Sequence, residues 1–240
     1  FSDIVAAPTG GLYIAYFDSA AKDLKYASNT AGSWVTTTVA SSGITGEYPA
    51  IALDINGTAH ITYYEYGDFG WVVDNLMHAT NASGAWTTET VASGGWFNAL
   101  VIDSEGHLHA SYRNSGLRHA TNASGSWQSE SVAMPDFWLS IAVDATDHLH
   151  ISSYQGYPAN DLIYTTNATG VWVAEPVDTD HGGEFNSLAL DENGKAHVSY
   201  CESFGGLRYA TNASGSWVSV PVDDARCGYT SLALDADGHA

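Results

Sequence analysis

Apolar and polar residues alternate along this chain in short runs, and four kinds of run recur in a fixed order. Run A is Ile51-Ala-Leu-Asp54 and its copies, and run B is Ala59-His-Ile-Thr-Tyr63 and its copies. Run C is a Leu-x-Tyr/His-Ala-Thr segment, and run D begins at a Trp and ends at a Val. The runs are rich in β-branched and aromatic residues, and no window of about a dozen residues keeps a helical period. The pattern therefore predicts an all-β chain of short strands.

One segment, from the Leu of run C to the Trp of run D, marks the repeat most clearly. It reads Leu-Arg-Tyr-Ala-Thr-Asn-Ala-Ser-Gly-Ser-Trp at 207–217, and related segments begin at Leu24, Leu76, Leu117 and Leu162. A period of about 45 residues is typical of repeat architectures. Asp-x-Asn-Gly between runs A and B, and Asn-Ala-Ser-Gly between runs C and D, are tight-turn sequences, so consecutive runs are expected to form antiparallel hairpins.

Four antiparallel strands in each of five repeats predict a β-propeller with five four-stranded antiparallel blades. We expect a single domain over residues 1–240, because a small sheet buries both of its faces only by packing against neighbouring sheets. The Trp and Val of run D, the Leu of run C and the Ile or Leu of run A would fill the spaces between blades. A β-sandwich is the alternative, but it gives no reason for a strict internal repeat. The predicted blades span approximately residues 1–40, 48–92, 97–133, 138–178 and 185–223.

Run A occurs once more than the other runs, because the chain begins and ends on a copy of it. The last copy predicts an extra inner strand over residues 229–240. Two explanations stay open: the chain is part of a longer protein, or one copy of run A patches the seam of the ring. The extra strand also offers a contact with a larger parent chain or with another subunit.

Composition narrows the choice of partners. Of 240 residues, 7 are Lys or Arg and 27 are Asp or Glu, which gives a formal net charge of −20. Such a field repels phosphate backbones and anionic membrane surfaces, so we expect no nucleic-acid partner. No apolar run approaches the roughly 20 residues of a spanning helix, so no membrane span is expected. Scarce Lys and abundant Thr, Ser, Gly and Asn favour a secreted or cell-surface protein, although the first residues do not resemble a signal peptide.

The two cysteines, Cys201 and Cys227, are too few for a disulfide scaffold or a Cys-rich metal site. Cys201 ends a copy of run B, and Cys227 lies in the D–A connection that follows. Because strands alternate in direction, both residues map to the same face. We therefore predict a disulfide between them in an oxidising compartment.

The C–D connection resembles the Asp-box, or BNR, repeat of sialidase-type propellers. That motif has Ser or Thr, an Asp two residues on, then Gly and Trp. Here Thr121-Asn-Ala-Ser-Gly-Ser-Trp127 keeps the Thr, Gly and Trp, and Ala123 stands at the Asp position. The chain is also similar to lectin-type propellers built from near-identical blades. The resemblance implies a propeller and, through the lectins, a carbohydrate ligand.

The arginines argue against sialidase-like catalysis, since sialidases need three of them converging on a carboxylate. The chain has only Arg113, Arg118, Arg208 and Arg226. Arg118 and Arg208 share one repeat position on run C, away from any central pocket. We therefore expect binding rather than catalysis.

In a propeller the D–A and B–C connections share one face, which we call the D–A/B–C face. These connections vary in length and composition while the others are nearly uniform, so this face is the predicted binding face. The residue three positions before run A is aromatic in every copy, and nearby positions add further aromatic and acidic residues. The predicted ligand-binding residues are Tyr48, Trp96, Phe97, Phe137, Trp138, Phe185, Tyr229, Trp71, Glu47 and Glu184.

These residue types suit a sugar, because aromatic rings stack on the CH faces of sugars and carboxylates accept hydrogen bonds from sugar hydroxyl groups. The alternative, which we favour for the strictly repeated position, is that each ring wedges between blades as part of the core. Trp96, Phe137 and Trp71 are not repeated, so packing explains them less well. The same holds for Phe69 and Tyr157.

Two other repeated positions carry potential metal ligands. His60, His109, His150 and His197 share one position of run B. In different blades they are too far apart to share an ion, so each is expected to be a hydrogen-bonded histidine between blades. The Asp that ends run A supplies too few oxygens for calcium and is expected to cap its own turn. We predict no metal and no cofactor.

The function that these observations favour is non-enzymatic: an extracellular propeller that binds carbohydrate through the aromatic loops of the D–A/B–C face. One alternative is a glycan-active hydrolase or lyase that uses acidic loop residues such as Glu47 or Glu184. A second alternative is a structural or adhesive repeat module of a larger surface protein.

Overall fold

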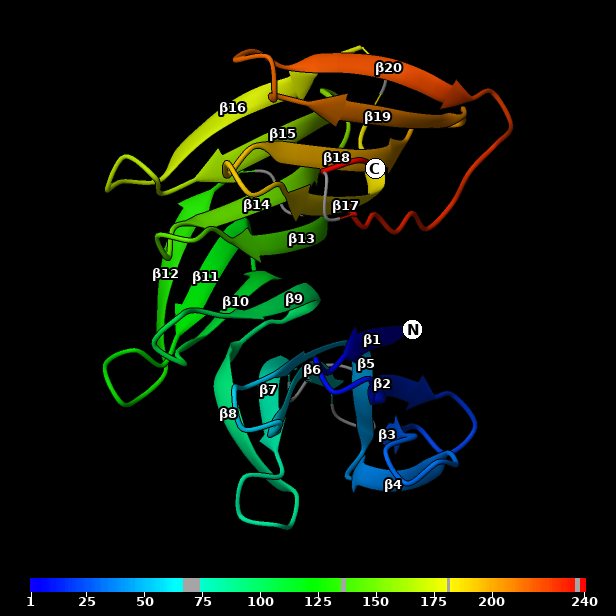
Figure 1. Ribbon diagram of the computed structural model, residues 1–240, viewed down its shortest axis with the longest axis vertical. Coiled ribbons are helices and arrows are strands. Elements are labelled where there is room, and N and C mark those ends of the chain that lie inside the picture. Colours follow the sequence, from blue (N-terminus) through cyan, green and yellow to red (C-terminus); the bar gives the residue numbers. More distant parts are fainter. Residues whose placement is uncertain (67–73, 135–136, 181, 236–237) are drawn as a thin grey trace. The chain divides into compact units, whose positions relative to one another are not determined.

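The computed structural model describes residues 1–66, 74–134, 137–180, 182–235 and 238–240. Twenty β-strands form five four-stranded antiparallel sheets, and strand order in each sheet follows the chain (Figure 1). No helix occurs in the described residues, so they contain no helix that could span a membrane. The all-β fold with five four-stranded antiparallel sheets, predicted from the sequence, is confirmed.

The strands of each sheet have the following bounds. The first sheet has β1 (Ser2–Ala6), β2 (Leu12–Asp18), β3 (Asp23–Ser28) and β4 (Val35–Ala40). The second has β5 (Ile44–Leu53), β6 (Ala59–Tyr66), β7 (Asp74–Thr80) and β8 (Thr87–Ser93). The third has β9 (Trp96–Ile102), β10 (Leu108–Arg113), β11 (Leu117–Thr121) and β12 (Gln128–Ala133). The fourth has β13 (Phe137–Val143), β14 (Leu149–Gln155), β15 (Asp161–Thr166) and β16 (Val173–Asp178). The fifth has β17 (Glu184–Leu190), β18 (Ala196–Cys201), β19 (Leu207–Thr211) and β20 (Val218–Asp223).

Side chains of Asp and Asn build the turns between these strands. Asp54 Oδ1 accepts hydrogen bonds from the backbone N–H groups of Asn56 and Thr58 at 2.9 and 2.7 Å. Asn81 Oδ1 accepts from the N–H of Ala59 at 2.9 Å, which ties the C–D turn to the start of β6. The predicted role of the repeated Asp as a cap of its own turn is confirmed. Equivalent bonds are made by Asp103, Asp144, Asp191, Asn29, Asn122, Asn167 and Asn212.

The chain folds as two compact units, residues 1–114 with 119–130 and residues 115–118 with 131–240. Within each unit the core lies between consecutive sheets, which is where the Leu of run C, the apolar residue of run A and the Trp of run D were expected. A single domain over the whole chain stays a prediction. Three core clusters contain these residues: Leu24, Ile51 and Trp86, and Leu76, Leu100 and Trp127, in the first unit, and Leu162, Leu188 and Trp217 in the second.

The last segment of the chain differs from the expectation. The described residues after Asp223 form no strand, so the extra inner strand predicted over residues 229–240 is wrong. The segment runs beside β17 (red in Figure 1), where Thr230 N–H donates to Phe185 O at 3.2 Å and Leu232 N–H donates to Ser187 Oγ at 3.1 Å. A strand needs a ladder of backbone bonds to a neighbour, and these isolated bonds do not make one. We call residues 224–240 the tail.

A disulfide joins Cys201, at the end of β18, to Cys227 in the tail. Their Cα atoms lie 5.7 Å apart, and the pairing is the one expected from the sequence. Cys227 N–H also donates to Gly205 O at 3.2 Å. The bridge therefore tethers the tail to the D–A/B–C face of the fifth sheet.

Candidate functional site

A β-bulge interrupts the first strand of the later sheets near its start. In the fourth sheet Phe137 pairs with Tyr154, and the next paired residue, Ser140, faces Ser152. Two residues, Trp138 and the one after it, therefore oppose a single residue of β14. The same register shift occurs in β5, β9 and β17. Because a bulge bends its strand and re-aims a side chain, it places the aromatic residue at the end of the sheet.

The aromatic residue of each bulge has a left-handed backbone conformation. Its φ is +49° in Tyr48, +52° in Phe97, +44° in Trp138 and +52° in Phe185, and Tyr229 of the tail has +60°. This region is unfavourable for residues with a Cβ, so surrounding contacts must hold these residues in it.

Buried side chains that follow the bulged aromatic residues supply those contacts. Asn186 Nδ2 donates to the backbone carbonyls of Trp138 and Gly183, and its Oδ1 accepts from the hydroxyl of Ser152. Trp138 is thus held through the first strand of the next sheet. Equivalent bonds run from Asn98 Nδ2 to the carbonyls of Tyr48 and Gly95, and from Thr230 Oγ1 to the carbonyl of Phe185.

Within each unit the bulged rings and the equivalent rings of Phe1 and Tyr229 contact one another along a row. The inner members of each row are half-buried and the rings of Phe1 and Tyr229 are exposed. Packing as core therefore accounts for only part of the surface of these rings. The ring centroids lie 4.2 Å apart in Phe1–Tyr48, 4.8 Å in Tyr48–Phe97, 4.8 Å in Trp138–Phe185 and 4.5 Å in Phe185–Tyr229.

A cavity of about 610 Å³ opens beside the row of the second unit. Phe137, Trp138 and Tyr154 form an aromatic wall, in which the centroids of Trp138 and Tyr154 lie 5.2 Å apart. All lining residues belong to the D–A/B–C face, because they come from strand ends and B–C connections. The others are Gly156, Tyr157, Asn160, Glu184, Ser203 and Phe204.

Polar groups line the remaining side of this cavity. The hydroxyl of Tyr154 donates to Asn160 Oδ1 at 2.7 Å, and the hydroxyl of Ser203 donates to Glu184 Oε1 at 3.3 Å. Among the described residues that line the cavity, Glu184 is the only charged one. The site thus offers apolar rings, one carboxylate and one amide to a ligand.

The corresponding position in the first unit has different chemistry. There Trp96 directly precedes the bulged residue Phe97, as Glu184 directly precedes Phe185 in the second unit. Its ring centroid lies 5.6 Å from Tyr64 and 6.4 Å from Tyr48. Burial raises the pKa of Tyr64 to about 12 and also raises the pKa of the Glu47 carboxyl. The result is a cluster of aromatic groups with Glu47 beside it, in place of an aromatic wall that faces Glu184.

No protein-family description and no curated protein matches the sequence, whereas many solved structures match the fold. Aleuria aurantia lectin in complex with Fucα1-6GlcNAc has a TM-score of 0.67 at 12% identity, over 96% of this chain and 82% of that chain. An ulvan lyase of a polysaccharide lyase family, bound to -[GlcA(1-4)Rha3S]-, has 0.63 at 15%, over 91% and 71%. A Hadza microbial sialidase has 0.61 at 12%, over 96% and 60%.

The chain has a β-propeller fold. Its five four-stranded sheets are the blades that the repeats predicted. At these identities the likeness shows the fold alone, and the resemblance of the C–D turns to the Asp-box stays an interpretation of the sequence.

The propeller brings some of the predicted site residues together and separates others. Phe137, Trp138 and Glu184 share one cavity. Phe185 and Tyr229 continue the same aromatic row, whereas Tyr48, Trp96, Phe97 and Glu47 belong to the first unit. Trp71 and Phe69 lie outside the described residues. Ligand binding by any of these residues stays a prediction.

Several cavity residues were missed from the sequence. Tyr154 directly follows a copy of run B, as Tyr64 does in the second blade, and this recurrence was an available signal. Asn160, Ser203 and Phe204 lie in B–C connections of different length and composition. No periodic pattern singles them out.

A glycine two residues before the bulged aromatic residue was also missed, although it recurs at 46, 95 and 183. A Cβ on Gly183 would lie 2.8 Å from Leu162 Cα, and one on Gly95 would lie 2.8 Å from Leu76 Cα. The glycine therefore lets the D–A connection pass directly over the Leu of run C in the preceding blade.

The repeated histidines are hydrogen-bonded, as expected, but inside their own blades rather than between blades. His60 Nδ1 lies 3.0 Å from His78 Nε2, and His109 Nδ1 lies 3.0 Å from His119 Nε2. No group of three or more His, Cys, Asp or Glu that could hold a metal ion occurs in the described part of the chain. In the later blades His150 and His197 contact the hydroxyls of Tyr164 and Tyr209.

Proposed function

We propose that the protein binds carbohydrate, without transforming it, in the cavity beside Trp138 and Tyr154. The observation that supports this most is the aromatic wall facing a carboxylate and an amide. Small-molecule sites are typically apolar with a few placed polar groups. A sugar ring would stack its CH face on the aromatic wall. Its hydroxyl groups would donate hydrogen bonds to Glu184 and accept one from Asn160 Nδ2.

Charge favours a neutral sugar over an acidic one. The described residues that line the cavity include no Lys or Arg, and Glu184 is an acidic residue. Burial, with the neighbouring Asp178 and Asp180, raises the pKa of Asp161 next to the cavity, which indicates a negative local potential. A carboxylate or sulfate on the ligand would meet repulsion here and no cationic partner.

The comparisons support the ligand class. The structure of Aleuria aurantia lectin holds a fucosylated disaccharide, which is neutral. The ulvan lyase structure holds an acidic, sulfated glycan, so a lyase acting on such a glycan would require cationic groups, and the described lining of this cavity offers none. We also propose an extracellular location, which the disulfide supports because such bonds persist in oxidising compartments.

The test is binding to a glycan array that holds neutral and acidic glycans, followed by titration of the best ligand. Trp138→Ala is expected to weaken binding by roughly thirtyfold, or about 2 kcal/mol, because it removes the central ring of the wall. Glu184→Gln is expected to weaken it by about tenfold, because a charged acceptor becomes a neutral one. Glu192→Gln, in an exposed A–B turn at the other end of the same blade, is the control and should bind as the wild type does.

Trp138→Phe keeps an aromatic ring and should retain part of the affinity, which separates loss of stacking from misfolding. Binding that survives both Trp138→Ala and Glu184→Gln would remove this cavity as the site. Selective binding of acidic glycans would contradict the charge argument. Cleavage of a glycan that stops in Glu184→Gln would establish the hydrolase or lyase alternative instead.

A further inference from the structure

Two aromatic side chains at the cavity beside Trp138 are exposed to solvent rather than packed. Tyr157 and Phe204 both line this cavity, yet Tyr157 is 91% exposed and Phe204 is 89% exposed. They are the most exposed Phe, Tyr or Trp residues in the described part of the chain. A residue that lines a cavity and stays almost fully exposed lies at the open edge of that cavity. We call Tyr157 and Phe204 the rim pair.

The rim pair comes from the B–C connections of two different blades. Tyr157 lies between β14 and β15, and Phe204 lies between β18 and β19. The equivalent connections of the first and third blades, residues 19–22 and 114–116, contain no aromatic residue. The two rings are therefore additions to individual blades and not a requirement of the repeated fold. Single exposed apolar residues are ordinary, whereas two at the edge of one cavity indicate a contact.

Hydrogen bonds hold the loop that carries Phe204. Glu202 N–H donates to Gly206 O at 2.9 Å, which closes the loop, and Arg208 Nη1 donates to Glu202 Oε1 at 2.8 Å. Phe204 itself has a φ of +66°. This left-handed conformation is unfavourable for a residue with a Cβ, whereas glycine adopts it without a steric penalty. The loop thus keeps an exposed ring in an unfavourable conformation that burial does not offset.

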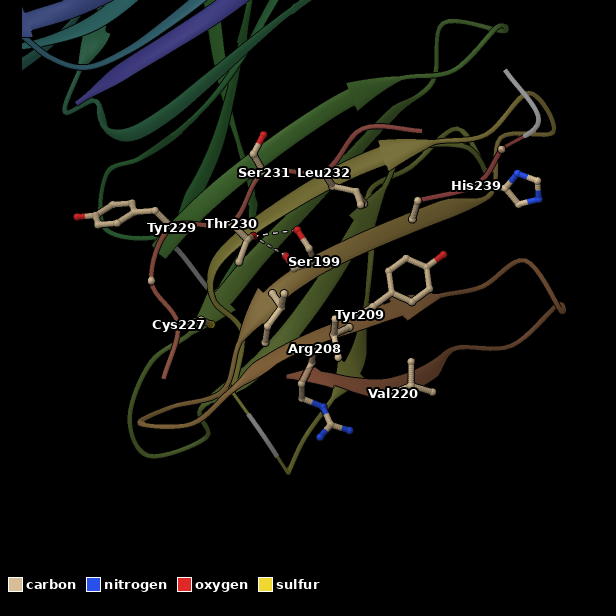
Figure 2. Close-up of a pocket in the computed structure, with 15 residues that line it drawn as sticks. Ser199, Arg208, Tyr209, Val220, Cys227, Tyr229, Thr230, Ser231, Leu232 and His239 are labelled. Atoms are coloured by element: carbon tan, nitrogen blue, oxygen red, sulfur yellow. Dashed lines mark hydrogen bonds between the residues drawn. The ribbon is translucent and has the colours of Figure 1, made fainter. Parts of the chain in front are cut away.

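The tail holds the same loop in place. The disulfide joins Cys227 to the end of β18, and Cys227 N–H donates to Gly205 O at 3.2 Å. Figure 2 shows the tail beside the fifth sheet, where Ser199 Oγ donates to Thr230 Oγ1 at 2.9 Å. Phe204 is therefore presented on a rigid loop, and a preorganised group loses little freedom when a ligand binds.

Side-chain bonds of Tyr154 brace both connections of the rim pair. Tyr154, whose ring belongs to the aromatic wall, donates its hydroxyl hydrogen to Asn160 Oδ1 at 2.7 Å. Asn160 N–H donates to Gly156 O at 3.4 Å, which closes the connection of the fourth blade. The hydroxyl of Tyr154 also lies 3.5 Å from Ser203 Oγ in the connection of the fifth blade. The wall of the cavity is thus linked to both loops at its edge.

We propose that the ligand is an oligosaccharide of at least two sugar units, and that the rim pair binds the unit next to the one in the cavity. This inference rests on the proposed function. The first unit stacks on the wall of Trp138 and Tyr154, and the second stacks its CH face on the rings of the rim pair. The hydroxyl group of Tyr157 offers the second unit a hydrogen-bond donor and acceptor. A monosaccharide in the cavity would leave both rim rings exposed.

The experiment compares glycans of different length by isothermal titration calorimetry. The probes are the neutral oligosaccharide that binds most tightly on the glycan array and its fragments of one and two sugar units. For the wild type, a two-unit fragment is expected to bind about tenfold more tightly than any one-unit fragment, because its second unit covers two further aromatic rings. The ratio of these two affinities is the measured quantity.

Substitutions in the rim pair should lower this ratio. Tyr157→Ala and Phe204→Ala should each reduce it, and the double variant should bring it close to one. Trp138→Ala should weaken the binding of both fragments and largely keep the ratio, because it acts inside the cavity. Val171→Ala, at a 65% exposed residue in the C–D turn of the fourth blade, is the matched control and should keep the ratio of the wild type.

The outcomes separate this inference from the proposed function. Equal binding of one-unit and two-unit fragments, or a ratio that survives in the double variant, would overturn the rim pair as a binding site and leave the cavity proposal in place. An array on which no neutral glycan binds would overturn both. Binding of the one-unit fragment by the double variant shows that this variant is folded, so a lowered ratio then reports the loss of contacts to the second sugar unit.

Discussion

At the scale of single residues, a glycine determines where the cavity groups lie. Gly183 has no Cβ, which lets the chain cross Leu162 closely before Glu184 enters the cavity. The aromatic residue that follows Glu184 then adopts its left-handed conformation, and Asn186 fixes the carbonyl of Trp138 behind it. The position of the carboxylate therefore depends on a contact made outside the cavity.

Gly183→Ala should destabilise the protein and weaken carbohydrate binding together. The new Cβ would lie 2.8 Å from both Cα and Cβ of Leu162, so one of the two backbones must move. Overpacking of this kind costs about 1–3 kcal/mol. Thermal unfolding and glycan titration measure the two effects. Gly228→Ala, whose Cβ would meet no atom within 4 Å, is the control and should leave both unchanged. Unaltered stability in Gly183→Ala would mean that the connection does not need this close approach.

At the scale of elements, titratable Asp and His side chains form hydrogen bonds within the hairpins. Burial raises the pKa of the turn carboxyls, but hydrogen bonds from the turn outweigh it, so Asp54, Asp103 and Asp191 have a pKa below the ordinary value. Burial, aided by the neighbouring His78, lowers the pKa of His60 from 6.5 to about 4. Burial also lowers the pKa of His78 itself.

These shifts predict that stability falls in acid in two stages. The histidines have a lower pKa when folded, so their contribution is complete above about pH 6.5 and is lost as the pH falls toward 4. The carboxylates also have a lower pKa when folded, so their contribution is lost below about pH 4. Urea unfolding at a series of pH values measures this. The double variant His60→Phe with His78→Phe should lose less stability in the upper stage. A free energy of unfolding that is constant between pH 7 and 4 would contradict the assignment.

The same elements show how far the sequence predicts the structure. Strands and hairpins followed from alternation and from turn residues such as Asp54 and Asn81, because both signals are local. The tail has the sequence of a strand but forms none, because a strand also needs a partner. The bulges and the positive φ of Trp138 depend on bonds from another sheet, such as that of Asn186, and no local pattern encodes them.

The candidate site was predictable to the extent that it repeats. Trp138 and Glu184 were found because they stand at a recurring position beside run A. Asn160 and Ser203 escaped because they lie in connections that differ from blade to blade, and only the fold brings them against Tyr154. Departures from the repeat are therefore where the structure adds most to the sequence.

At the scale of the whole molecule, net charge affects the choice of ligand. The chain carries a formal charge of −20, so an anionic glycan is repelled as it approaches the propeller. A neutral glycan meets no such repulsion.

Raising the ionic strength should therefore strengthen the binding of an acidic glycan and leave the binding of a neutral glycan nearly unchanged. Between about 0.01 and 0.15 M the Debye length falls from about 30 to 8 Å, which screens most of the repulsion from charges away from the site. Titration of one neutral and one acidic glycan across this range measures both dissociation constants. Binding of the acidic glycan that weakens with salt would indicate attraction to a cationic group instead.

The left-handed aromatic residues have a consequence for engineering this scaffold. Glycine adopts positive φ without a steric penalty, whereas each bulky residue there costs about 1–2 kcal/mol of backbone energy. An optimisation guided by backbone energy alone would accordingly exchange Tyr48, Phe97 or Trp138 for glycine. It would yield a more relaxed framework that has lost its half-buried rings, so stabilising this propeller requires these positions to be exempted.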